Sequence, residues 1–370
     1  GQLVTDENLI ISFQAPIEAV LPTEAEAVDF LAAVKNEEIE APVEEAIRGN
    51  LVEVAPKAGK IKKVTTNQIL GTTEWTLSNG VRVVIKPTEF KQDEILFSAF
   101  SKGGQSLVAT EDLVSAALAT DVISVSGIAD MTMTDLQKAL TGKNISLSPS
   151  INANTESIEG GTTVKDLETL LQLNYLYFTA PRRDENAYAM LMSVLESQLA
   201  NRDKNPKVAF SDSVSMMANN YSPRTVIFNQ EALTHADLDK SLEIYKARFA
   251  NPADFTFTFV GKVNPDDEAF QQLVCTWLGN LKTSKKKEAV RDNGDRVPEG
   301  INKNYFSRRM ETKTASNRIQ YTSYDIPYTL ANELNMEMIG RILSTRYLES
   351  IREREGGSYG VGCAGGLQVY

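Results

Sequence analysis

Histidine and cysteine are scarce in this chain, and their scarcity excludes several kinds of catalytic site. The 370 residues include one histidine, His235, and two cysteines, Cys275 and Cys363. A catalytic zinc needs about three side-chain ligands and an open fourth position, and Ser-His-Asp or Cys-His catalysis would have to use this one histidine. No nucleophile motif accompanies His235, so we reject the Ser-His-Asp and Cys-His mechanisms. We interpret His235 as an exposed residue in the first helical turn after Thr234.

The two cysteines match neither a metal-binding nor a redox spacing. Cys275 falls on the apolar face of a predicted helix and Cys363 on the apolar side of a predicted strand, so we interpret both as small core residues. Their separation in the sequence neither requires nor forbids a disulfide.

Long apolar runs and an excess of positive charge are also missing. No stretch reaches the roughly 18 apolar residues that span a bilayer, and a net charge of −11 argues against nucleic acid or an anionic membrane as a partner. No phosphate-binding glycine motif occurs. The composition, 42% hydrophobic and 24% charged, is that of a globular protein. No signal peptide is visible, and because the chain opens on Gly1 and stops at Tyr370 inside a strand pattern, we expect a fragment.

Residues 1–66 are expected to be the tail of a preceding domain plus a linker. This stretch holds a predicted strand at 9–13, a helix from Thr23 to Lys35, an acidic stretch at 36–45 and a basic connector at 55–63.

Residues 67–283 are predicted to form one α+β domain with two layers, a mostly antiparallel sheet and helices on one face. Asn79-Gly80 between two β-rich runs predicts a hairpin. Further strands are expected at 95–104, 145–164 and 255–261, and helices at 111–126, 132–142, 165–180, 184–202, 206–221, 235–249 and from 265 onward.

Residues 284–300 form a charged linker, and 301–370 are expected to begin a second, similar domain that is truncated. A strand at 318–324, a helix at 329–355 and a strand from Tyr359 repeat the strand–helix–strand order of the first domain.

The end of that last helix brings two polar side chains toward one surface. Gly356-Gly357 supplies the left-handed residue that closes a helix, so Arg352 in the last turn and Tyr359 at the start of the following strand are expected to meet. Taken by itself, an arginine there also complements the helix dipole and a tyrosine there is ordinary packing, and that interpretation stays open.

The segment Ile351–Val361 resembles the "LRE…G.(A/S)Y.V" signature of the pitrilysin/insulinase/mitochondrial-processing-peptidase family of zinc peptidases (M16). Two further segments, one starting at Leu77 and one spanning Phe257–Leu281, resemble the start and the end of a repeat in that family. In the two-half members of the family, this signature lies in the C-terminal half, which lacks zinc. The resemblance implies the α+β repeat of these peptidases.

The family's zinc motif, His-x-x-Glu-His, lies on the helix after the first strand pair, which corresponds here to residues 113–127. By the resemblance, Thr120, Ile123 and Ser124 occupy the three motif positions, and Glu196 falls near the remaining glutamate ligand. None of the three motif residues can act as the family's ligands or general base. We therefore expect no metal or other cofactor in this chain, and zinc in a missing N-terminal half.

The resemblance implies that Arg352 and Tyr359 bind peptide substrate and donate to the developing oxyanion. The predicted function is the non-catalytic, substrate-binding C-terminal half of a zinc metalloendopeptidase. Such a half would be inactive alone and would close around a peptide with a zinc-bearing N-terminal half, in the same or another chain. The alternative is a non-enzymatic peptide-binding or assembly subunit on the same scaffold. Bacterial proteins similar to this one are often exported, which favours a periplasmic or exported location.

Overall fold

The computed structural model describes residues 10–16, 18–35, 49–309 and 312–367, and its contacts divide the chain into two units, residues 1–47 and 48–370, which we treat separately. The first unit contains helix α1 (Glu24–Lys35). Thr23 caps α1 as expected: its hydroxyl accepts the Glu26 N–H, and the Glu26 carboxylate accepts the Thr23 N–H at 2.8 Å. Residues 10–13 form no strand, contrary to expectation, and the acidic stretch 36–45 lies outside the described residues.

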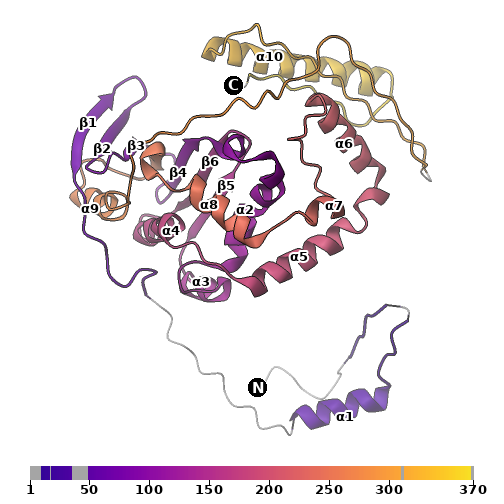
Figure 1. The fold of residues 1–370 in the computed structure, drawn as a ribbon, viewed down its shortest axis with the longest axis horizontal. Helices are drawn as coiled ribbons and strands as arrows, with labels where there is room; N and C mark the ends of the chain where they lie inside the picture. Colours follow the sequence, from indigo (N-terminus) through magenta and orange to yellow (C-terminus); the bar gives the residue numbers. More distant parts are fainter. Residues whose placement is uncertain (1–9, 17, 36–48, 310–311, 368–370) are drawn as a thin grey trace. The chain divides into compact units, whose positions relative to one another are not determined.

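One seven-stranded sheet organises the second unit, in the order β1-β2-β3-β7-β4-β6-β5 (Figure 1). All neighbouring strands are antiparallel except β3 and β7, which are parallel. This confirms the predicted α+β class and the mostly antiparallel sheet. The strands are β1 (Ile61–Asn67), β2 (Thr72–Leu77), β3 (Arg82–Pro87), β4 (Ile95–Lys102), β5 (Ile145–Ile151), β6 (Thr155–Thr162) and β7 (Thr256–Gly261).

Helices pack on one face of this sheet, because each central strand buries alternate side chains. In β4, Phe97 and Ala99 are buried, whereas Leu96 and Phe100 are 50% and 42% exposed on the opposite face. Phe270 of α9 packs against Trp75 of β2, which places that helix on the buried face. The helices of this layer are α2 (Leu113–Ser126), α3 (Met133–Ala139), α4 (Leu167–Thr179), α8 (Leu238–Arg248) and α9 (Glu268–Trp277).

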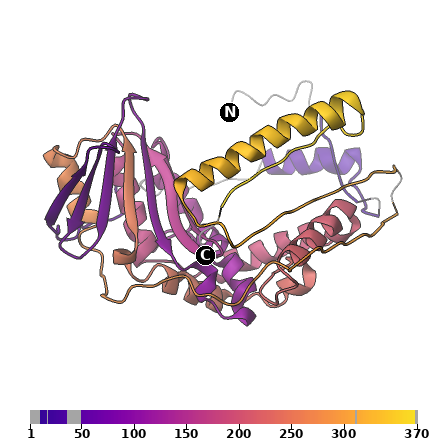
Figure 2. The same cartoon turned by 90° about the horizontal axis from the view of Figure 1, so that it is seen from above.

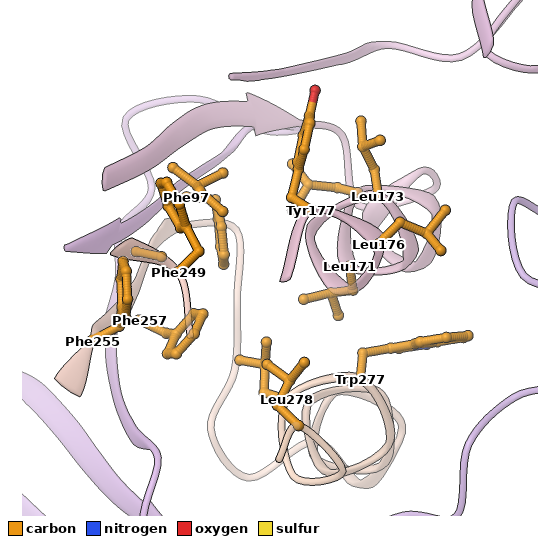
Figure 3. Close-up of a cluster of buried hydrophobic side chains, with 14 of the residues drawn as sticks. Phe97, Leu171, Leu173, Leu176, Tyr177, Phe249, Phe255, Phe257, Trp277 and Leu278 are labelled. Carbon is orange, nitrogen blue, oxygen red and sulfur yellow. The ribbon is translucent and has the colours of Figure 1, made fainter. Parts of the chain in front are cut away.

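Aromatic side chains fill the core between β7 and the helices, as Figure 3 shows. Phe249, at the end of α8, stacks on Phe255 with ring centroids 5.6 Å apart, and Phe178 of α4 meets Phe255 edge-on at 5.1 Å. Phe257 extends the cluster into the sheet. These contacts join α4, α8 and β7 into one core.

Three more helices lie beyond this layer: α5 (Glu185–Leu199), α6 (Pro206–Ala218) and α7 (Gln230–Leu233). Asp184 and Asn205 cap α5 and α6 as their positions predicted. The prediction for α8 was wrong at its start. Thr234 ends α7, and Asp237 instead caps α8 by accepting the Lys240 N–H at 2.7 Å, so α8 begins at Leu238.

The expected connector at 55–63 also differs from the structure. Its last residues belong to β1, which pairs with β2 along its length. Leu51, earlier still, is buried in the core, and the Gln172 side chain accepts the N–H groups of Leu51 and Val52. Residues 49–66 therefore pack with the sheet rather than serving only as a linker.

In the last part of the chain the predicted helix is confirmed and the predicted strands are not. Helix α10 (Leu330–Tyr347) continues into the π-helical turn Leu348–Arg354. Residues 318–324 and 358–367 are irregular instead of extended strands, and Val369 lies outside the described residues. Strands satisfy their backbone by pairing with other strands, and no described strand pairs with these segments. No helix in the described part of the chain is long and apolar enough to cross a membrane.

Candidate functional site

Arg352 and Tyr359 lie together on the surface after α10. Gly356, with φ +57°, turns the chain back after the helical turn that carries Arg352. The guanidinium carbon then lies 4.7 Å from the centroid of the Tyr359 ring, a cation–π contact. The Arg352 side chain is 41% exposed and Tyr359 is 87% exposed, so both polar ends are open to solvent.

The segment that carries Tyr359 is not a strand but a return segment, residues 358–367, that lies beside α10 (Figure 2). Gly340 permits the approach, because a side chain there would lie 2.5 Å from the Gly365 nitrogen. The Ser344 hydroxyl donates to the Cys363 carbonyl at 2.6 Å and accepts its N–H at 2.7 Å. Glu333 accepts the Leu367 N–H at 2.7 Å. These contacts hold the return segment on the helix, and the Arg352–Tyr359 pair lies at the turn between them.

Polar neighbours of the pair are few among the described contacts. The Arg352 Nε lies 3.5 Å from a carboxylate oxygen of Glu353, a weak and exposed ion pair. The guanidinium carbon lies over the tyrosine ring, and the Arg352 side chain remains 41% exposed, so it is accessible to a ligand. Such a pair can donate several hydrogen bonds to a carbonyl or carboxylate ligand.

The positions that correspond to the zinc motif lie on α2 and carry no metal ligand. Ile123 is buried in the core, and the Ser124 hydroxyl donates to the Thr120 carbonyl of its own helix at 2.9 Å. Thr120 is half-buried. The structure thus uses these positions for packing and for a local hydrogen bond.

Glu196 and His235 are both exposed. Glu196 lies on α5, as expected, but His235 lies in the turn between α7 and α8 rather than in a first helical turn. Within the described residues, no group of three or more histidine, cysteine, aspartate or glutamate side chains could hold a metal ion. Cys275 is buried, Cys363 is half-buried, and they are not paired with each other.

A buried charged cluster around Glu156 was missed at the sequence level. Glu156 in β6 is 1% exposed and accepts the N–H of Gly104, and burial raises the pKa of its carboxyl group while the nearby Arg248 opposes that shift. A cavity of about 170 Å³ adjoins this cluster, and a second of about 270 Å³ is lined by Arg224 and Asp295. Neither cavity is lined by Arg352 or Tyr359. The glycine pair Gly103-Gly104 is the one local sequence signal that could have drawn attention to this cluster.

Comparisons with known proteins give a consistent result. Residues 236–368 match the family model described as the peptidase M16 inactive domain. The chain is 25% identical to "Zinc protease PQQL-like" of Arabidopsis thaliana over 95% of this chain and 36% of that protein. It is 22% identical to "Probable zinc protease PqqL" of Escherichia coli strain K12 over 84% of this chain and 33% of that protein.

The crystal structure of the periplasmic protease PqqL from Escherichia coli matches the fold with a TM-score of 0.67 and 20% identity. The match covers 92% of this chain and 37% of that chain. The chain spans about a third of the length of the curated relatives it matches.

Proposed function

Because the chain belongs to the M16 peptidase family, we propose that it forms the non-catalytic, substrate-binding C-terminal half of a zinc metalloendopeptidase. A second half, in the same or another chain, supplies zinc and the general base, and this chain supplies hydrogen-bond donors to the peptide. The observation that carries the proposal is the exposed cation–π pair of Arg352 and Tyr359. The absence of ligands at the three motif positions of α2 supports the non-catalytic role.

The chemistry of the pair suits a carbonyl that gains negative charge. Arg352 offers a planar, permanently charged set of N–H donors, and Tyr359 offers a neutral O–H donor. The cation–π contact with the ring favours one position of the guanidinium, so less order is lost when a ligand binds. Donors fixed in this way stabilise an oxyanion more than mobile ones do.

Substitution of the pair in the complete protein tests this role. Arg352→Ala and Tyr359→Phe are each expected to lower kcat by about 10²–10³-fold, the usual effect of removing one oxyanion donor. Tyr359→Phe keeps the ring under the guanidinium and removes only the hydroxyl group. Arg354→Ala is the matched control, because Arg354 lies in the same helical turn and has no ring contact with Tyr359 among the described contacts. Unchanged turnover in both variants would leave the pair without a catalytic role.

The rival function is a peptide-binding or assembly subunit without enzymatic activity. In that case Arg352 and Tyr359 have only a structural role, as the cation–π contact at the end of the helical turn also allows. The gene upstream of Gly1 separates the two functions. An in-frame His-x-x-Glu-His segment there, or in a separate chain that copurifies with this one, supports the peptidase half, and its absence from both supports the assembly subunit. We also propose export, by similarity to the periplasmic Escherichia coli protein, and the same upstream sequence tests it through a signal peptide.

A further inference from the structure

Residues 283–297, here called the strap, leave the peptidase-like domain after α9 and lead toward α10. Residues 284–300, which include all but the first residue of the strap, were predicted to be a solvated linker from their charge and their glycine and proline content. They contain no helix or strand in the structure. They nevertheless make hydrogen bonds and ion pairs to the domain along most of their length.

The strap is attached to the domain at its start by Asn79 and Asn251. The Thr283 hydroxyl donates to the Asn79 carbonyl at 2.6 Å. The Asn251 side chain accepts the Ser284 N–H at 2.8 Å and donates to the Lys286 carbonyl at 2.9 Å. Because the Asn251 side chain bonds both a donor and an acceptor of the strap, it fixes the direction of the strap backbone as well as its distance from the domain.

Arg248 forms the second attachment, through both of its terminal nitrogens. They donate to the two carboxylate oxygens of Glu288 at 2.8 and 3.3 Å. The Arg248 side chain is 8% exposed and that of Glu288 is 30% exposed. A bidentate, largely buried pair of this kind is stronger than an exposed one. Arg248 also neighbours the buried Glu156, so it serves two carboxylates from different segments.

The third attachment lies near Ser106 and Arg224. Ser106 accepts the Arg291 N–H at 3.0 Å through its hydroxyl and the Asn293 side chain at 2.9 Å through its carbonyl. Asp295 lies 3.6 Å from Arg224, whose side chain is 12% exposed and also donates to the Gln105 carbonyl at 2.7 Å. Both arginines thus belong to the folded domain, and both carboxylates belong to the strap.

We propose that the strap is a latch: the Arg248–Glu288 and Arg224–Asp295 pairs hold the strap on the domain. They thereby fix the point on the domain from which the chain continues toward α10. An undocked linker of this length would span roughly 20 Å with free rotation, whereas a docked one leaves only the residues after Val297 to move. This inference goes beyond the proposed peptidase role and does not depend on it.

Limited trypsin digestion of the full 370-residue chain tests the latch, because Lys285, Lys286, Lys287 and Arg291 lie within the strap. The rate of cleavage is also measured for a synthetic peptide of residues 283–297 with the same substitutions, and the peptide rate is divided by the rate for the full chain. This ratio, the protection, removes any effect of a substitution on trypsin specificity. Glu288→Ala combined with Asp295→Ala is expected to lower the protection by about tenfold or more, since hydrogen bonds to charged groups are lost and cleavage follows the population of the open segment.

Asp292→Ala is the matched control. It removes one negative charge from the same segment, where the double variant removes two, and Asp292 pairs with Arg296 and Gly294 inside the strap. Its protection is expected to match that of the unsubstituted chain. The carboxylates are changed rather than the arginines, because Arg248→Ala would leave Glu156 buried without its positive neighbour.

Three outcomes would overturn the latch: no protection in the unsubstituted chain, equal protection in the double variant, or an equal rise in cleavage after Arg183 in the folded domain. The last result would show general unfolding rather than release of the strap. None of these outcomes bears on turnover by the complete peptidase, so the two proposals fail independently.

Discussion

Single buried polar residues connect segments that lie far apart in this chain. Gln172 sits in the leucine-rich helix α4 and is 1% exposed, yet its side-chain oxygen accepts the N–H groups of Leu51 at 2.8 Å and Val52 at 3.2 Å. The partners are 121 and 120 residues away. No local pattern could predict this contact, whereas the meeting of Arg352 and Tyr359 followed from one helix end and one glycine turn.

Gln172→Leu is expected to destabilise the chain by about 2 kcal/mol, because it leaves the Leu51 N–H buried without its acceptor. Urea unfolding followed by circular dichroism measures the change. Gln137→Leu, on the exposed side of α3, is the control and is expected to have little effect. Equal stability of the two variants would contradict this account.

Asp166 makes stability depend on pH. Its carboxylate accepts the Asn144 N–H at 2.9 Å and the Thr163 hydroxyl at 3.1 Å, and these bonds lower its pKa below the ordinary 3.8. A lowered folded-state pKa stabilises the folded chain above pH 3.8, and this contribution is lost as the pH falls through the folded value.

Asp166→Asn should therefore be less stable than the unsubstituted chain at pH 7, by about 1–2 kcal/mol. The difference should shrink at pH 3, because the carboxyl group of the unfolded chain is protonated below its ordinary pKa of 3.8 while the folded group has the lower pKa. Urea unfolding at both pH values measures it. Asp266→Asn, an exposed position whose carboxylate makes no described hydrogen bond, is expected to leave stability unchanged at both. A difference that grows at low pH would refute the assignment.

At the scale of elements, the sequence predicted helices better than strands. Apolar periodicity and capping residues are local, so α4, α5, α6 and α10 appear close to their expected bounds. The alternating segments at 318–324 and 359–369 were predicted as strands on equally regular patterns. A strand also needs a neighbour, and the sequence pattern alone does not say whether one is present.

Gly160 in β6 shows how closely the edge strand packs. A side chain there would place its Cβ 1.8 Å from the Ser146 carbonyl oxygen in β5. Gly160→Ala is expected to push β5 away from β6 and to cost about 3 kcal/mol, the upper end of the usual range for overpacking. Gly49→Ala, with no atom within 4 Å of the new Cβ, is the control. Thermal unfolding compares them, and a Gly160→Ala chain as stable as the control would show that β5 moves without cost.

At the scale of the whole molecule, the class of the fold and the family were accessible from the sequence, and the path of the connecting segments was not. The hairpin signal Asn79-Gly80, and the segments that resemble the start and the end of a family repeat, predicted an α+β fold. The docking of residues 49–60 and of the strap depends on Gln172, Arg248 and Arg224, whose partners are distant in sequence. Composition alone assigned both segments to linkers.

The non-catalytic role predicts that the purified chain holds less than about 0.1 zinc per molecule after dialysis, since a structural or catalytic site needs three or four protein ligands. Atomic absorption measures the content, and a zinc enzyme of known metal content serves as the positive control. One zinc per chain would refute the role.

The position of β7 also determines when the molecule can become stable during synthesis. Strands β3 and β4 follow one another in the chain, but β7, made about 170 residues after β3, lies between them. Until Thr256–Gly261 has left the ribosome, β3 and β4 lack the strand that lies between them, and their facing edges have backbone N–H and C=O groups without this partner. The seven-stranded sheet can therefore close only late in synthesis, when this one strand becomes available to both of its neighbours.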